Sequence, residues 1–68
     1  MAKRKITDTD KQIIEMKAQG FMDKEIAESL NIEYSTYRYR YNRLLIKMDA
    51  LNAPNLVYTA FQKGILKI

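Results

Sequence analysis

The segment from Tyr34 to Met48, YSTYRYRYNRLLIKM, constrains the fold of this chain more than any other stretch. Its alternating tyrosines and arginines would suit the two faces of a β-strand, and tyrosine favours strands. Helical spacing instead aligns Tyr37, Tyr41, Leu44 and Met48 in one apolar stripe, which continues after the alternation has ended. Because the helix accounts for more residues, we predict a helix over 34–48 and assign both tyrosines of the stripe to the core.

The opposite face of this helix is polar and basic. At about 100° per residue, the side chains that project away from the apolar stripe are those of Ser35, Arg38, Tyr39 and Asn42, with Arg43 at the edge. A face of this kind is either an ordinary solvated surface or a binding surface, and the pattern alone leaves both interpretations open.

Three further helices are predicted from the residues at their ends. Thr7 can cap the first helix, which Gly20 ends, and Asp23 can cap a short second helix. Asn52 can cap the last helix through its side chain, and Pro54 is compatible with the first turn of that helix. The chain is therefore predicted to be all-α, a four-helix bundle-like domain that contains a helix-turn-helix, with helices over about 8–19, 23–30, 34–48 and 53–63.

The length and composition exclude several classes of function. Sixty-eight residues make one small domain, expected over 6–68 after a basic tail over 1–5. Cysteine and histidine are absent, which removes thiolate and imidazole ligands and the commonest general base. We therefore expect no catalytic residue, no metal site and no cofactor. No apolar run approaches the roughly 18 residues of a membrane span, and we expect a cytoplasmic protein.

Charge is distributed unevenly along the chain. Residues 6–33 hold seven acidic and three basic side chains, whereas residues 34–49 hold one acidic and four basic side chains. A basic helix beside an acidic body indicates a polyanionic partner. A short helix, a turn and a longer basic helix form a helix-turn-helix, whose second helix lies in the major groove of double-stranded DNA. Similar helical hairpins also occur as packing units.

A set of short motifs follows one register through all four predicted helices. They are AQG at 18–20, KEIAESL at 24–30, Ile32, Thr36, LLIKM at 44–48, Asn52, NLV at 55–57 and KGIL at 63–66. In this order the chain resembles the LuxR/GerE family of helix-turn-helix domains from residue 6 almost to its end. The resemblance implies a sequence-specific DNA-binding regulator of transcription. The length is similar to that of stand-alone GerE-like regulators, so no receiver or sensor domain is expected within the chain.

The resemblance also implies which side chains contact DNA. Base edges would be read from the matching exposed positions of the 34–48 helix, which are Ser35, Arg38, Tyr39 and Asn42. Arginine can donate two bonds to guanine, asparagine can pair with adenine, and tyrosine can pack on a thymine methyl group. Phosphate oxygens would be contacted by Thr36, Arg40, Arg43 and Lys47. For Arg40 a salt bridge to an acidic residue of the second helix, such as Glu28, is an equal alternative. The AKRK tail at 2–5 could add phosphate or minor-groove contacts, although a disordered basic tail is the default expectation.

Two helix starts depart from the family pattern. Met22 and Glu33 stand where the family has Ser or Thr as N-cap. Asp23 and Ser35 are expected to take over these roles, which would shorten or fray the start of the 34–48 helix. Tyr34 stays open, because its ring would either close the core at this start or contact the DNA backbone.

A domain of this size reads few bases, so we expect a homodimer on a two-fold symmetric operator. In the family the last helix supplies the dimer contact, and the matching face carries Asn55, Tyr58, Thr59 and Gln62. An ordinary solvent face is an equal alternative, and Ile65, Leu66 and Ile68 would cover the core or extend the interface.

Tyrosine and arginine are also enriched at protein interfaces. A module that binds another regulator or RNA polymerase is therefore an alternative function, and a sigma-factor region 4 fragment is a second. A DNA reader should lose affinity steeply with salt, whereas a protein-binding module should not.

Overall fold

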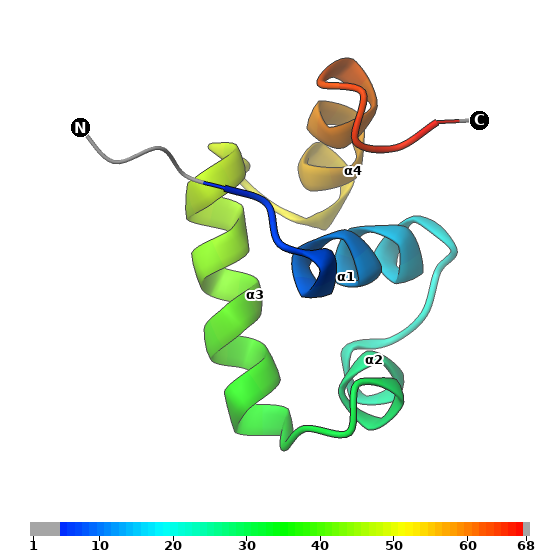
Figure 1. The fold of residues 1–68 in the computed structure, drawn as a ribbon, viewed down its shortest axis with the longest axis vertical. Coiled ribbons are helices and arrows are strands. Elements are labelled where there is room, and N and C mark those ends of the chain that lie inside the picture. Colours follow the sequence, from blue (N-terminus) through cyan, green and yellow to red (C-terminus); the bar gives the residue numbers. More distant parts are fainter. Residues whose placement is uncertain (1–4, 68) are drawn as a thin grey trace.

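The computed structural model describes residues 5–67, which form four helices and no strand. The helices are α1 (Asp8–Ala18), α2 (Asp23–Ser29), α3 (Tyr34–Met48) and α4 (Ala53–Gln62), as Figure 1 shows. The predicted all-α class is confirmed, and the predicted boundaries differ from the observed ones by one residue at three helix ends. None of the helices in this part of the chain is long and apolar enough to cross a membrane.

The predicted caps of α1 and α4 are confirmed. Thr7 Oγ1 accepts a hydrogen bond from the Asp10 N–H at 3.1 Å, and Asp10 Oδ2 accepts one from the Thr7 N–H at 3.1 Å. This reciprocal capping box satisfies two donors that the first turn of a helix leaves free. At α4, Asn52 Oδ1 accepts from the Asn55 N–H at 2.9 Å, and Pro54 lies in the first turn.

The predicted caps of α2 and α3 are wrong. Asp23 is the first helical residue of α2 and its carboxylate binds other helices, while Met22 holds the N-cap position without a side-chain bond. Glu25 Oε1 compensates in part, because it accepts from the Met22 N–H at 2.8 Å. Ser35 does not replace Glu33 as the N-cap of α3 either. The helix starts at its predicted first residue without a side-chain cap, and its first buried residue is Tyr37.

The core lies between α3 and the other three helices, and all three pack on the same side of α3 (Figure 1). The predicted stripe of α3 is buried along its whole length, and the two tyrosine rings of the stripe stack with their centroids 5.9 Å apart. Leu66 folds back after α4 and is buried too, whereas Ile68 lies outside the described residues. The buried apolar residues are Ile13, Ile14, Ile26, Ala27, Tyr37, Tyr41, Leu44, Met48, Leu56, Ala60 and Leu66.

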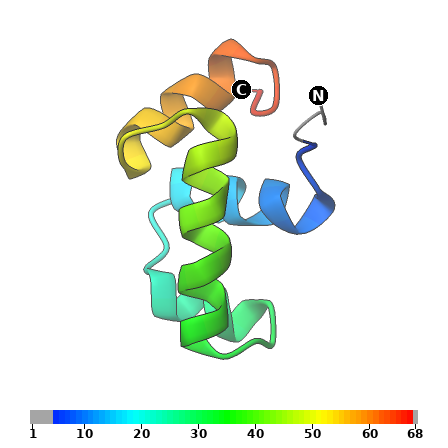
Figure 2. The same cartoon turned by 90° about the vertical axis from the view of Figure 1, so that its left-hand side faces the viewer.

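This packing leaves one long side of α3 without a covering helix. In Figure 2 the molecule is turned so that α3 faces the viewer, and α1 crosses behind it. The turn after α3 is made by Asp49, whose φ of 54° lies in the left-handed region. This residue ends the helix and directs the chain across the core into α4.

Candidate nucleic-acid interface

The uncovered side of α3 carries the outward face that the helical spacing predicted. Ser35, Tyr39 and Asn42 are exposed, whereas the apolar stripe is buried. Ile46 continues the outward face by one more turn and is 62% exposed. The sequence interpretation missed this side chain, although its spacing of four residues from Asn42 places it on the same line. The face therefore combines hydroxyl, amide and apolar groups along about three turns.

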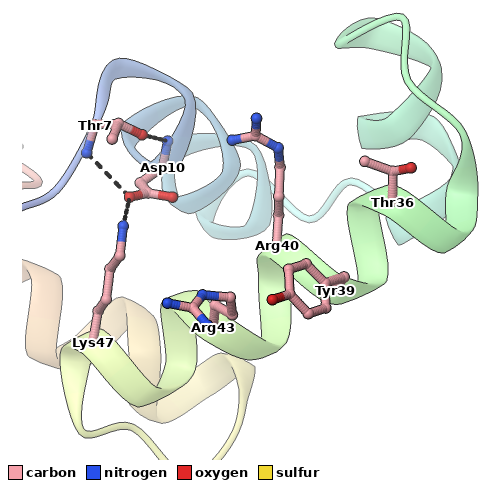
Figure 3. Close-up of a pocket in the computed structure, with 7 residues that line it drawn as sticks. All are labelled: Thr7, Asp10, Thr36, Tyr39, Arg40, Arg43 and Lys47. Atoms are coloured by element: carbon pink, nitrogen blue, oxygen red, sulfur yellow. Dashed lines mark hydrogen bonds and ion pairs between the residues drawn. The ribbon is translucent and has the colours of Figure 1, made fainter.

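A cleft separates this face from the N-terminal end of α1. Its lining is formed by Thr7, Asp10, Thr36, Tyr39, Arg40, Arg43 and Lys47 (Figure 3). The structure thus brings together all four residues predicted to contact phosphate. The guanidinium of Arg43 lies over the ring of Tyr39, 5.8 Å from its centroid. Three cationic side chains and one carboxylate line the cleft, which leaves it net positive.

Lys47 is already engaged by the protein at the end of this cleft. Its Nζ donates to Asp10 Oδ2 at 2.9 Å (Figure 3). It also donates to the Lys5 carbonyl oxygen at 3.1 Å. Burial alone would raise the pKa of Asp10, but the bonds from Lys47 and Thr7 outweigh burial and hold this pKa below its ordinary value. The sequence analysis did not identify this pair, because no local pattern links residues 37 positions apart.

Arg38 is turned toward α2. Its Nη1 donates to Asp23 Oδ2 at 2.8 Å, and its guanidinium lies 5.6 Å from the centroid of the Tyr41 ring. Its side chain remains 42% exposed, so it lies at the edge of the outward face. Among residues 5–67 it is Arg38 and not Arg40 that forms an ion pair with α2, so the alternative pairing of Arg40 with Glu28 is wrong. Successive residues of a helix are rotated by about 100°, so Arg38 faces α2 although the next residue, Tyr39, faces outward.

The other predicted positions are distributed as follows. Tyr34 is 51% exposed, so its ring does not close the core, and it lines a shallow hollow with Met22 and Lys24.

On α4, Tyr58 is 60% exposed and its hydroxyl oxygen accepts from Gln62 Nε2 at 3.0 Å. Thr59 and Asn55 are half-buried, and Asn55 Oδ1 accepts from the Leu51 N–H at 2.9 Å. Residues 2–4 of the predicted DNA-contacting tail lie outside the described residues.

Comparisons with known proteins identify the family of this chain and a similar protein. The family described as "Bacterial regulatory proteins, luxR family" matches residues 4–60. The "Transcriptional regulatory protein DesR" of Bacillus subtilis (strain 168) is 32% identical over 62 residues, which make up 91% of this chain and 31% of that protein. The chain thus spans about a third of the length of this relative. No solved structure matches the chain.

Proposed function

We propose that this chain, which belongs to the luxR family of bacterial regulatory proteins, binds double-stranded DNA through the uncovered side of α3 and regulates transcription. The observation that carries the proposal is that α1, α2 and α4 cover only the apolar side of a helix whose other side is polar and basic. Because this is a family of regulators, the chain is not an enzyme. A DNA-binding regulator of this family is expected to work in the bacterial cytoplasm.

Base recognition is assigned to the outward line of α3. The major groove of B-DNA, about 12 Å wide, accepts a single helix. Asn42 and Ser35 present hydrogen-bonding groups along this line, and Tyr39, which is 64% exposed, can donate its hydroxyl or pack on a thymine methyl group. Arg38 lies at the edge of the line with most of its guanidinium donors free for guanine.

Phosphate binding is assigned to the cleft between α3 and the start of α1. Arg40 and Arg43 supply the charge that no carboxylate neutralises among the described residues, and Thr36 supplies a hydroxyl donor. Lys47, which is also predicted to contact phosphate, donates to Asp10 at the end of the cleft. It neutralises this carboxylate and so keeps the cleft positive.

The test is selection of bound fragments from random double-stranded DNA at physiological salt, with the unaltered chain and Asn42→Ala. The unaltered chain should enrich a two-fold symmetric motif with half-sites about 10 bp apart. Asn42→Ala should lose an adenine preference worth about 1–3 kcal/mol, because it removes a bidentate pair. Gln19→Ala is the matched control, since it removes an exposed amide at the end of α1. Absence of any enriched sequence would favour a protein-binding module, with the Met22 and Tyr34 hollow as its candidate surface.

We further propose a homodimer through α4. Tyr58 is a large exposed ring whose hydroxyl accepts from Gln62 at the C-terminal end of α4, and Leu51, which is 87% exposed, is bonded to Asn55 at the N-terminal end. An aromatic anchor with a polar rim suits a small two-fold interface.

Tyr58→Glu should abolish the dimer, because it would place two like charges near the two-fold axis and remove the ring. Sedimentation of the protein bound to a full operator should then give one protein per DNA instead of two. Ser29→Glu introduces the same charge at an exposed position of α2, which does not contact α4, and should leave two proteins bound. Two proteins bound in the Tyr58→Glu variant would show that the dimer forms elsewhere.

A further inference from the structure

One carboxylate joins three helices next to the DNA-facing side. Asp23 Oδ1 accepts from Lys17 Nζ at 2.9 Å and from the Tyr37 hydroxyl at 2.7 Å, and Asp23 Oδ2 accepts from Arg38 Nη1 at 2.8 Å. Its donors come from α1 and α3, and Asp23 itself begins α2. Both carboxylate oxygens are therefore used, and the acid cannot rotate without losing at least one of these bonds.

The arginine in this cluster is held from two sides. The carboxylate of Asp23 binds Nη1, and the ring of Tyr41 lies beneath the guanidinium at 5.6 Å. A guanidinium has five N–H donors in a fixed plane, and the donors of Nε and Nη2 point side by side along one edge. In the described structure this edge carries no protein partner, and the side chain is 42% exposed. It matches the O6 and N7 acceptors of guanine.

From this geometry we propose that Asp23 is a positioning residue for base recognition: it fixes the guanidinium of Arg38 so that the Nε and Nη2 edge reads guanine. The inference rests on the proposed function, because it assumes that α3 enters the major groove. A free arginine side chain loses much rotamer freedom when it binds a base, and this loss weakens binding. The Arg38 side chain, already held by Asp23 and Tyr41, loses that freedom when the protein folds, so less is lost when it binds DNA. A guanidinium held in one orientation also discriminates against bases that do not present two adjacent acceptors to its Nε and Nη2 edge.

The charge of the cluster permits this role. Lys17 and Arg38 contribute two positive charges against the single negative charge of Asp23, so the cluster does not repel DNA. The acid also lies behind the arginine, bound to α1 and to the Tyr37 hydroxyl, and not on the outward line of α3. Contact with guanine therefore does not require the ion pair to break.

The experiment compares binding of the unaltered chain, Asp23→Asn, Arg38→Ala and the double variant to the selected operator and to the same operator with one guanine replaced. Asp23→Asn has the same shape but binds the guanidinium more weakly, and the preference for guanine should fall about tenfold, the scale of one base contact. Affinity for random DNA should stay equal or rise, because a negative charge is lost. In the Arg38→Ala background, Asp23→Asn should change the preference no further.

Two controls separate positioning from charge and from folding. Glu28→Gln removes one negative charge from an exposed site on the same helix and should leave the guanine preference intact. Circular dichroism at the binding temperature verifies that each variant is folded.

The outcomes are distinct. An unaltered chain without any sequence preference would refute the proposed function itself. A sequence-specific chain whose Asp23→Asn variant keeps the full guanine preference would refute the positioning role alone. The same conclusion would follow if Asp23→Asn reduced the preference equally with and without Arg38, or if Glu28→Gln had the same effect.

Discussion

Lys47→Met is expected to lower the free energy of unfolding at pH 7 by about 3 kcal/mol, the cost of removing one partner from a buried ion pair. Methionine retains the aliphatic stem of lysine, so the variant mainly deletes the ammonium. The side chain of Asp10 is only 5% exposed and would keep its charge with the Thr7 N–H as its remaining donor. A domain of this length is stable by roughly 3–10 kcal/mol in total, so the loss is a large share.

The pH dependence identifies the cause. The pKa of Asp10 is lowered in the folded chain from an ordinary value of 3.8, so its contribution to stability is present above that value and is lost as the pH falls through the folded pKa. In Lys47→Met the carboxyl can protonate at higher pH, because no ammonium opposes it. The difference between the two proteins should be complete at pH 7 and should shrink below about pH 4.

Urea unfolding of both proteins between about pH 7 and pH 2.5 measures this difference. Lys11→Met is the matched control, because it makes the same substitution at an exposed position of α1 and should stay within about 0.5 kcal/mol of the unaltered chain. A constant difference between the proteins at all pH values would mean that the loss arises from packing and not from the Asp10 pair.

Local signals in the sequence were enough to predict the helices. The stripe of α3 is set by spacing within one segment, and the caps Thr7 and Asn52 act on backbone groups three residues away. Where the predictions failed, at Asp23 and Ser35, a cap was inferred from propensity alone. At Asp23 the tertiary contacts prevailed, because its carboxylate gains stronger bonds from cationic side chains than from backbone N–H groups.

The sequence predicted which side of α3 is exposed, but not which of its side chains are held by other helices. The exposed side of α3 follows from its period, but the partners of Arg38 and Lys47 depend on how α1 and α2 pack against it. Those partners, Asp23 and Asp10, are 15 and 37 residues distant along the chain. Helical spacing carries no information on such distances, so the sequence could not show which cations of α3 are neutralised.

Two of the four cationic side chains of α3 form ion pairs with the rest of the domain, and two do not. Arg38 binds Asp23 of α2, and Lys47, near the other end of the helix, binds Asp10 of α1. Between them, Arg40 and Arg43 form no ion pair with any residue in 5–67. The pairs thus fix α3 to the body of the domain near each end, while its middle turn carries the charge that is free for DNA.

Arg40→Ala combined with Arg43→Ala is therefore expected to reduce DNA affinity about 100-fold at physiological salt, roughly tenfold for each guanidinium that is removed from a phosphate. The slope of log affinity against log salt concentration should also become shallower by about two, since each phosphate contact contributes nearly one unit. Both arginines are exposed and unpaired with carboxylates, so the stability of the fold should change little. Fluorescence anisotropy with labelled duplexes at several salt concentrations measures affinity and slope together.

The control must remove the same net charge at another place. Lys63→Ala with Lys67→Ala does so in the exposed stretch after α4, which lies on the far side of the domain from α3 (Figure 1) and does not line the cleft. If binding depends on the cleft, this pair should leave the salt slope unchanged. An equal loss of affinity in both double variants would instead mean that DNA responds to the overall positive charge of the chain, and the middle turn of α3 would then have no special role in binding phosphate.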